Sequence, residues 1–254
     1  MRACHRNSER VLPVLLLAGL CCAVAGPPEA PAADWPGFRG PLHNGFSPEK
    51  LVNRDWREKP PQTLWTAAMD DDGYAGPAVA NGVLYIVDHK GSEDVVRAID
   101  TESGRDLWTY AYPENKRSNY GHARATPLIS DGRVYTLSRR GVLNCIDAAN
   151  GSILWTQDII DELGGRVPKY EMSMSPFVDG ERLRVVPGGR KAAVAALDRR
   201  TGTVIWKGGG GDKPGYATPV AADIGGRRQY IVFTAAALIG VDSDDGSLLW
   251  RLPW

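Results

Sequence analysis

The sequence predicts an all-β protein, a β-propeller built from four-stranded antiparallel blades. The first observation behind this prediction is a motif, Asp-x3-Gly-x3-Trp, that occurs four times with its Trp residues 47, 51 and 44 positions apart. The second is that each interval holds short apolar runs divided by turn residues, without a helical period sustained over three turns. A repeat of about 45 residues that contains four short strands is typical of a propeller blade.

The motif places an Asp and a Gly in a turn and a Trp in the strand that follows. Its four copies are Asp100, Gly104 and Trp108; Asp147, Gly151 and Trp155; Asp198, Gly202 and Trp206; and Asp242, Gly246 and Trp250. A small residue stands two positions before each Asp, and a Pro stands 20 to 23 positions before it. These landmarks divide the chain into repeats of about 74–112, 122–159, 171–209 and 216–254.

The first repeat shows why each strand is expected. Apolar and β-branched residues predict strands over 78–80, 83–87, 95–99 and 106–111. Asn81-Gly82 joins the first two strands as a hairpin turn, because both residues tolerate a positive φ. Gly104 is expected to take the left-handed conformation in the last turn, where the Asp100 carboxylate accepts hydrogen bonds from backbone amides. Later repeats carry their hairpin turns at Asp131-Gly132, Asp179-Gly180 and Gly225-Gly226.

The recurring Trp lies on the outer strand of each predicted blade. Both faces of a blade must be covered by its neighbours, so a large indole can fill the gap between two wedge-shaped sheets while its N–H finds a carbonyl. Truncation of a large buried side chain to Ala costs about 3–5 kcal/mol of stability. We therefore expect Trp155→Ala to lower the denaturation midpoint strongly.

The repeat unit resembles the tryptophan-docking repeat of pyrroloquinoline quinone (PQQ)-type propellers. This superfamily includes the quinoprotein alcohol dehydrogenases and the BamB-like outer-membrane assembly lipoproteins. The opening segment 34–41 and the segment 167–170 also look like parts of a bacterial PQQ-like repeat group. The resemblance concerns architecture more than activity, because such repeats build the fold and functional sites are grafted onto it.

The number of outer strands indicates a longer ring. Residues 63–66 resemble a further outer strand, with Trp65 placed 43 positions before Trp108, but no inner strands precede it. We therefore expect five outer strands but only four sets of the inner strands that complete a blade. Because complete members of the superfamily have seven or eight blades, we expect the chain to form part of such a ring. A compact four-bladed ring is the alternative.

The first 25 residues have the pattern of a secretory signal peptide. Three Arg precede an apolar run over 11–20, and Ala23-Val24-Ala25 offers a cleavage site before Gly26. The run is shorter than the about 20 apolar residues that span a bilayer. We expect an exported protein, periplasmic or extracellular and not transmembrane, with a lead-in segment at 26–62 and the propeller at 63–254.

A lipid anchor on Cys21 or Cys22 is the alternative at this end of the chain. The preceding Ala18-Gly19-Leu20 disfavours it, because a small residue should stand directly before a lipidated Cys. Cys4 also belongs to the predicted signal peptide, so Cys145 remains alone and no internal disulfide is expected.

Charge argues against a nucleic-acid partner. The chain holds 30 Lys and Arg against 30 Asp and Glu. Removal of the signal peptide takes three Arg and Glu9, which leaves 27 basic and 29 acidic residues and a net charge of −2. Binding to phosphate backbones needs clustered cationic excess. A protein partner or a small ligand is expected instead.

No catalytic or metal site follows from the sequence. The resemblance to quinoproteins implies calcium ligands, a catalytic Asp and an adjacent Cys pair, whereas the Cys pair of this chain lies in the signal peptide. We therefore expect no cofactor, with PQQ and calcium as the alternative, for which Glu171 and Asn119 are the candidate loop ligands. Asp70-Asp71-Asp72 is interpreted as a hydrated loop. The remaining histidines, His43, His89 and His122, share no metal-ligand spacing.

Geometry favours one binding surface on a propeller. Loops that enter the innermost strands converge on the propeller axis, so their side chains can line a funnel. Tyr and Arg in such loops are common binding anchors, although Tyr and Met also close protein cores. The candidate funnel residues are Tyr74, Asn119, Tyr120, His122, Arg124, Met172, Ser173, Met174 and Tyr216.

Two functions from different classes remain open at this point. The leading hypothesis is an exported, non-catalytic propeller that acts as a binding scaffold for a protein or ligand in the cell envelope. The alternative is a PQQ-dependent alcohol dehydrogenase of which this chain is a part. A remnant without independent function is a third possibility.

Overall fold

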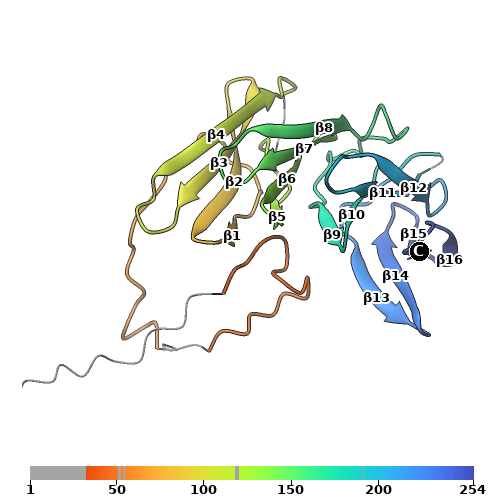
Figure 1. The fold of residues 1–254 in the computed structure, drawn as a ribbon, viewed down its shortest axis with the longest axis horizontal. Coiled ribbons are helices and arrows are strands. Elements are labelled where there is room, and N and C mark those ends of the chain that lie inside the picture. Colours follow the sequence, from red (N-terminus) through yellow and green to blue (C-terminus); the bar gives the residue numbers. More distant parts are fainter. Residues whose placement is uncertain (1–32, 51–52, 54, 118–119, 191) are drawn as a thin grey trace, which may run out of the picture. The chain divides into compact units, whose positions relative to one another are not determined.

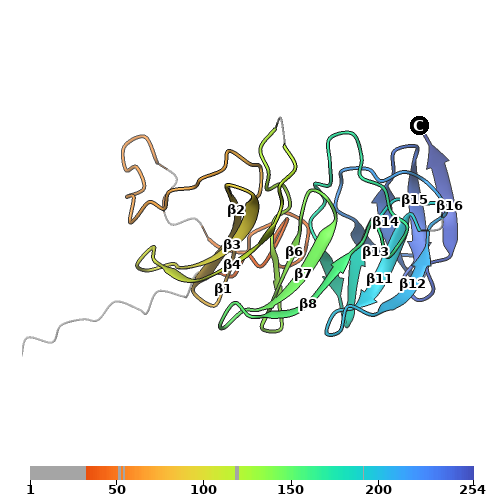
Figure 2. The ribbon, with the colours of Figure 1, turned by 90° about the horizontal axis from the view of Figure 1, so that it is seen from above.

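The computed structural model describes residues 33–254 except 51–52, 54, 118–119 and 191. The predicted signal peptide, the alternative lipid anchor and Asn119 lie outside the described residues. The described part folds into strands and connecting loops, and none of it forms a helix able to cross a membrane. Its strands make four antiparallel sheets, each with four strands consecutive in the chain (Figures 1 and 2). The predicted all-β blade architecture is confirmed.

The strands follow one another in the order expected for propeller blades. The first sheet holds β1 (Ala78–Ala80), β2 (Val83–Lys90), β3 (Glu93–Asp100) and β4 (Asp106–Pro113). The second holds β5 (Leu128–Ser130), β6 (Arg133–Leu137), β7 (Val142–Asp147) and β8 (Ile153–Asp158). The third holds β9 (Phe177–Asp179), β10 (Arg182–Val185), β11 (Val194–Asp198) and β12 (Val204–Gly208). The fourth holds β13 (Val220–Ile224), β14 (Arg227–Phe233), β15 (Ala237–Asp242) and β16 (Leu248–Pro253).

Several strands extend beyond the expected bounds. In the first sheet, β2 and β3 continue through polar residues to the pair Lys90↔Glu93. Gly91 closes this turn with a φ of 66°. Hydropathy alone misses such strand ends, because backbone pairing rather than side-chain burial holds them.

The small residue before each repeat Asp is explained by strand register. Ala98, Cys145, Ala196 and Gly240 lie directly opposite Trp108, Trp155, Trp206 and Trp250 on the neighbouring strand. A register shift follows each of these pairs. An indole that folds across its own sheet needs a small partner at the opposing position, since cross-strand Cβ atoms lie only about 5 Å apart.

The indoles of Trp108, Trp155 and Trp206 then reach the turn of the next blade, whereas Trp250 Nε1 donates to Gln229 of its own blade. Trp108 Nε1 donates to the Ala148 carbonyl at 3.0 Å, and Trp206 Nε1 donates to the Ser243 carbonyl at 3.2 Å. Both acceptors directly follow the repeat Asp. At the equivalent position in the third blade, the Arg199 carbonyl accepts from the Tyr135 hydroxyl at 2.9 Å, and Trp155 Nε1 has no partner among the described residues.

The repeat Gly has two separate reasons to lack a side chain. Gly151 has a φ of 74°, and a Cβ placed on it would lie 2.7 Å from Cδ2 of Trp108. The hairpin residue Gly132, in the same blade, has a φ of 69° but open space around it. The comparison separates backbone strain from contact with the docked indole.

We expect Gly151→Ala to destabilise the protein more than Gly132→Ala. Both variants carry the left-handed penalty of about 1–2 kcal/mol, whereas only Gly151→Ala adds overpacking against Trp108, which costs about 1–3 kcal/mol. Chemical denaturation of both variants measures the difference. Equal midpoints would show that the indole moves aside without cost.

The prediction of a fifth outer strand at 63–66 is wrong. Residues 63–66 adopt no strand, because no neighbouring segment pairs with them. Trp65 nevertheless docks on the first blade in the same way as Trp108 docks on the second blade. Its Nε1 donates to the Thr101 carbonyl at 2.8 Å, and its ring covers Gly104. Docking by the indole therefore does not require a strand.

The lead-in segment contacts the inner strands of three blades. Trp35 exchanges two backbone hydrogen bonds with Val79 of β1, at 2.8 and 2.9 Å. The Pro36 carbonyl accepts from Ile129 of β5 at 2.7 Å, and His43 packs edge-on against Phe177 of β9 with ring centroids 4.6 Å apart. The segment around 35–43 is thus an ordered part of the fold that follows the inner edges of the blades.

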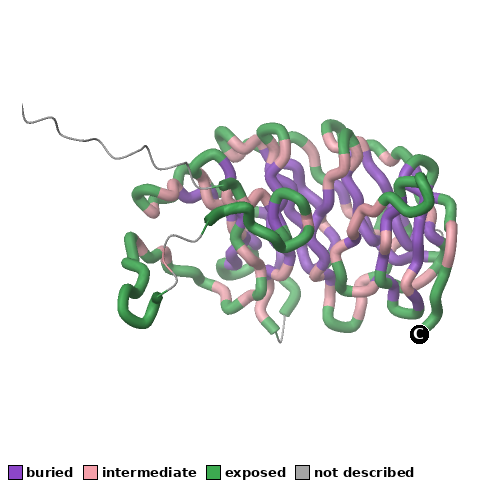
Figure 3. The backbone as a smooth tube through the Cα atoms, turned by 90° about the horizontal axis from the view of Figure 1, so that it is seen from below, coloured by how far each residue is buried: buried purple, intermediate pink, exposed green. Residues whose placement is uncertain are grey.

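The apolar core lies between the sheets. One buried cluster joins the first and second sheets, and a larger one joins the second, third and fourth. Figure 3 shows buried positions along the strands and exposed positions mainly in the connections. The core holds the strands in place, while the connections at the strand ends remain accessible.

Candidate functional site

Two kinds of connection meet at one end of each sheet. Neighbouring strands run antiparallel, so the loop that enters each inner strand lies at the same end as the turn between the second and third strands. The candidate funnel residues belong to the entering loops. This end of the sheets is called the loop face below.

Three exposed tyrosines from successive entering loops lie in contact on the loop face. Tyr120 meets Tyr170 edge to face with ring centroids 5.9 Å apart, and Tyr170 meets Tyr216 at 6.1 Å. The Tyr216 hydroxyl accepts a hydrogen bond from the Tyr170 backbone N–H at 3.3 Å. The three residues are 54%, 47% and 44% exposed. We call Tyr120, Tyr170 and Tyr216 the tyrosine row.

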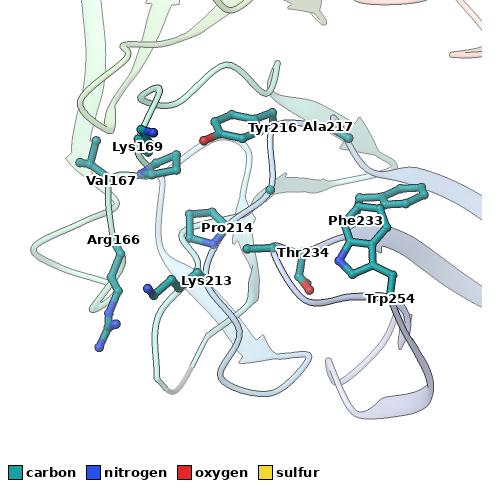
Figure 4. Close-up of a pocket in the computed structure, with 13 residues that line it drawn as sticks. Arg166, Val167, Lys169, Lys213, Pro214, Tyr216, Ala217, Phe233, Thr234 and Trp254 are labelled. Carbon is teal, nitrogen blue, oxygen red and sulfur yellow. The ribbon is translucent and has the colours of Figure 1, made fainter.

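The tyrosine row leads into a pocket of about 800 Å³ that Tyr216 helps to line. The pocket lies between the loops at 166–169 and 213–217 and the β14–β15 turn. Its wall is largely apolar, formed by Val167, Pro168, Pro214, Ala217, Phe233 and Trp254. Phe233 and Trp254 stand together on one side, with ring centroids 4.9 Å apart (Figure 4).

The opposite side of the pocket carries positive charge. Arg166, Lys169 and Lys213 line it across from Phe233 and Trp254 (Figure 4), and all three are exposed. Within the described part of the chain none of them forms an ion pair, and no acidic residue lines the pocket. We call this cavity the basic pocket. Unpaired cations beside apolar walls favour a ligand that carries negative charge on an apolar body.

A buried ion-pair network lies beneath the loop face between the first three blades. Arg139 has no exposed side-chain surface and contacts Glu114 at 3.0 Å, Glu171 and the Lys116 carbonyl. Arg124 binds the other oxygen of Glu171 at 2.8 Å. Burial raises the pKa of Glu114, although the charge of Arg139 opposes that shift. The network ties loops from three blades together.

Glu171, a candidate calcium ligand in the sequence, has both carboxylate oxygens engaged by arginines. It also has a φ of 64°, which costs energy for a residue with a side chain. Divalent cations such as calcium need free carboxylate oxygens. The described residues around Glu171 therefore do not fit a bound calcium ion. They give no support to Glu171 as a calcium ligand beside PQQ.

A second polar cluster joins the loop at 70–73 to the loop at 121–123. The rings of His89 and His122 stack with centroids 3.5 Å apart, and His89 Nδ1 lies 2.9 Å from Asp94. Asp71 accepts backbone hydrogen bonds from His122 at 2.9 Å and Ala123 at 3.0 Å. Burial acts to raise the pKa of Asp71, but the hydrogen bonds from Ala123 and His122 hold it below its ordinary value.

This cluster corrects the interpretation of Asp71 as part of a hydrated loop. Asp71 is not hydrated but binds the neighbouring loop, and two histidines without metal spacing are brought into contact by the fold. No group of three or more metal-ligating side chains with the geometry for an ion occurs among the described residues. The cluster therefore connects loops in the first and second repeats.

We expect Asp71→Ala to lower the free energy of unfolding by about 1–3 kcal/mol at neutral pH, because it leaves buried amide donors unpaired. A carboxyl whose pKa is depressed on folding stabilises the native state above its unfolded pKa of about 4. That stabilisation is lost as the pH falls through the folded value, so the difference between Asp71→Ala and the parent should shrink below about pH 4. Urea titrations at several pH values measure this trend. Asp70→Ala, whose side chain is exposed, serves as the control.

The predicted funnel residues separate into accessible and buried groups. Tyr74, Tyr120 and Tyr216 are exposed, and Ser173 Oγ lies 3.4 Å from the Tyr216 carbonyl as a partly exposed donor. His122 and Arg124 are partly or largely buried in the contacts described above. The prediction that Met172 and Met174 face the funnel is wrong: they are only 2% and 1% exposed because they pack into the core between blades.

Most residues of the basic pocket are not among those that the sequence predicts for a binding surface. Tyr170 could have been found, since it stands six positions before Pro176 just as Tyr120 stands seven positions before Pro127. Phe233 and Lys213 give no such signal, because they come from different connections that only the fold brings together. Cys145, the Cys that remains outside the predicted signal peptide, is fully buried, and burial raises its pKa to about 11.

Comparison of sequences gives relatives of two kinds. BamB, the outer membrane protein assembly factor of Yersinia pestis, is 24% identical over 192 residues, which cover 74% of this chain and 45% of that protein. The quinohemoprotein alcohol dehydrogenase ADH-IIG of Pseudomonas putida is 29% identical over 154 residues, which cover 56% of this chain and 20% of that protein. The chain thus spans less than half the length of either relative.

Comparison of structures supports the same fold. The quinohemoprotein alcohol dehydrogenase of Comamonas testosteroni superposes with a TM-score of 0.63 at 17% identity, over 87% of this chain and 41% of that chain. BamB of Moraxella catarrhalis superposes with a TM-score of 0.57 at 17% identity, over 75% of this chain and 56% of that chain. At such identities the likeness shows the fold alone.

Membership in a family rests on a match along most of the propeller. The family profile described as outer membrane protein assembly factor BamB matches residues 55–126 and 92–254. These ranges include every copy of the Asp-x3-Gly-x3-Trp motif. The chain therefore belongs to this family of PQQ-repeat β-propellers.

Proposed function

We propose that this protein is an exported, non-catalytic binding scaffold of the cell envelope, and that its loop face binds a protein partner. The observation that carries the proposal is the continuity of the tyrosine row with the basic pocket. Exposed Tyr side chains are frequent anchors in protein interfaces, because they combine a large apolar area with a polar tip. The signal peptide predicted at 1–25 and the BamB assembly factors among the relatives support the proposal of an envelope role.

The composition of the basic pocket supports binding over chemistry. Its described lining offers no carboxylate, imidazole or thiol that could act as a general base or nucleophile. Apolar walls with a few charged groups are typical of sites that recognise a ligand.

The alternative is a PQQ-dependent alcohol dehydrogenase, favoured by the quinohemoprotein relatives. Mixing the purified full chain with PQQ and calcium tests it. We expect neither quinone absorbance on the protein nor dye-linked oxidation of alcohols. Either signal would overturn the non-catalytic assignment.

Site-specific photo-cross-linking tests the binding role. The photoreactive residue p-benzoyl-phenylalanine replaces Tyr170 on the loop face in cells that produce the full chain, and Leu107 near the opposite end of the first blade serves as the control. Both positions are exposed, at 47% and 56%. We expect discrete adducts with envelope proteins from position 170 only. Equal adducts at both positions, or none at position 170, would contradict the proposal.

A further inference from the structure

The basic pocket is held open by contacts within the protein. Pro214 and Thr234 form an isolated β-bridge, and the Ala235 N–H donates to the Lys213 carbonyl at 3.0 Å. Thr234 Oγ1 donates to Asp212 at 2.8 Å, and Asp212 also pairs with Arg251. These bonds fix the loop that carries Lys213 against the turn that follows Phe233. A preformed pocket loses little conformational entropy when a ligand enters.

Charge within the pocket is of one sign. Arg166, Lys169 and Lys213 line the cavity without acidic neighbours in its lining, while Asp212 is turned to Thr234 and Arg251. Lys169 lies 5.1 Å above the Tyr170 ring, so a cation also borders the tyrosine row. An anionic group would thus be attracted both inside the pocket and at its entrance.

The apolar part of the site is larger than a single small molecule can cover. Phe233 and Trp254 form one wall, and Tyr216 continues into Tyr170 and Tyr120 through ring contacts of 6.1 and 5.9 Å. The tyrosines come from the loops that enter the second, third and fourth blades, and Phe233 and Trp254 come from the ends of β14 and β16. A ligand that uses all of them must be extended.

We propose that the basic pocket and the tyrosine row bind an extended, acidic segment of a protein chain that carries aromatic side chains. One aromatic side chain of the segment enters the pocket against Phe233 and Trp254, and flanking Asp or Glu residues pair with Lys169, Lys213 and Arg166. Further aromatic residues lie on the tyrosine row. The inference rests on the proposed function and names the chemistry of its partner.

Fluorescence anisotropy with defined peptides tests this assignment on the full chain. The probe is a labelled, blocked decapeptide in which Glu and Phe alternate. Two matched peptides replace every Glu by Lys or every Phe by Ser. We expect saturable binding of the Glu-Phe peptide, weakened by added salt, and binding at least about tenfold weaker for each matched peptide.

Two variants locate the binding. Lys169→Glu combined with Lys213→Glu should weaken binding of the Glu-Phe peptide by about tenfold or more, because attraction becomes repulsion. Arg57→Glu combined with Arg105→Glu changes the net charge equally at exposed positions elsewhere and should leave the affinity within about twofold. Phe233→Ala should weaken binding by about fivefold through lost apolar contact. Thermal unfolding of each variant shows whether it has folded.

Each result decides the assignment. Equal affinity for the Lys-Phe and Glu-Phe peptides, or an unchanged affinity in folded Lys169→Glu, Lys213→Glu protein, would overturn it. So would binding of N-acetyl-phenylalanine as tight as that of the decapeptide, since the pocket would then take a small carboxylate. Adducts from position 170 without peptide binding would overturn this inference and leave the scaffold role standing. Peptide binding without such adducts would support the pocket chemistry and count against the scaffold role.

Discussion

Trp206→Ala is expected to lower the free energy of unfolding by about 3–5 kcal/mol, the cost of removing a large buried aromatic side chain. The Trp206 residue is 8% exposed, its N–H donates to Ser243 of the fourth blade, and its ring lies beside Tyr230 with centroids 6.4 Å apart. The variant therefore opens a cavity between two blades and removes a bond between them.

Chemical denaturation followed by Trp fluorescence and circular dichroism measures this effect. Trp56→Ala is the matched control, because Trp56 is 63% exposed in the lead-in segment and should change stability by less than about 0.5 kcal/mol. Trp155→Ala removes an indole that is only partly buried and has no hydrogen-bond partner among the described residues, so it should cost less than Trp206→Ala. A Trp206→Ala midpoint equal to that of Trp56→Ala would show that indole docking does not hold the blades together.

Arg139→Met is expected to cost about 3–5 kcal/mol, because it leaves Glu114 buried without its partner. The side chains of Arg139 and Glu114 are 0% and 4% exposed, so solvent cannot replace the lost charge. By contrast, Arg200→Met breaks an ion pair between side chains that are 58% and 61% exposed. That control should cost less than about 1 kcal/mol.

The Arg139→Met effect should depend on pH in a defined direction. Burial already raises the pKa of Glu114 in the parent protein, and the loss of Arg139 removes the charge that opposes this shift. A carboxyl whose folded pKa lies above its unfolded value of about 4.3 destabilises the native state increasingly as the pH rises through the folded pKa. The loss should therefore grow as the pH rises above the unfolded value of about 4.3.

A second substitution checks the cause. Glu114→Gln in the Arg139→Met background should recover part of the stability and remove most of the added pH dependence, since no buried charge then remains at that position. An Arg139→Met loss that is independent of pH and unaffected by Glu114→Gln would assign the effect to packing of the Arg139 stem instead.

The blade repeat was predictable because its chemistry is local and recurs. A turn that needs a positive φ requires Gly, an indole that folds across its own sheet requires a small opposing residue, and the carbonyl after each Asp offers an acceptor. The same reasoning failed at 63–66, where the sequence matches an outer strand but no strand among the described residues pairs with it. A docked indole and a paired strand are separate requirements, and the Trp pattern reports only the first.

The candidate site was predictable only in part. Tyr120 and Tyr216 were found because they recur in the entering loops, while Met172 was misplaced because an apolar side chain in a loop can turn into the core. Phe233 ends strand β14, whereas Lys213 and Lys169 come from two separate loops, and the three share no spacing. Their meeting depends on how three connections pack, which no periodic pattern encodes.

The sequence by itself determined the blade, its turns, its docking indoles and the family to which the chain belongs, since each of these depends on contacts that repeat at a constant spacing. Only the tertiary structure decided that Arg139 joins Glu114 to Glu171 and that His89 stacks on His122. It also brought three cations that form no ion pair among the described residues into one pocket with an apolar wall beside the tyrosine row. These contacts join side chains from loops distant in sequence, and the packing of neighbouring blades, not any local preference, sets which loops meet.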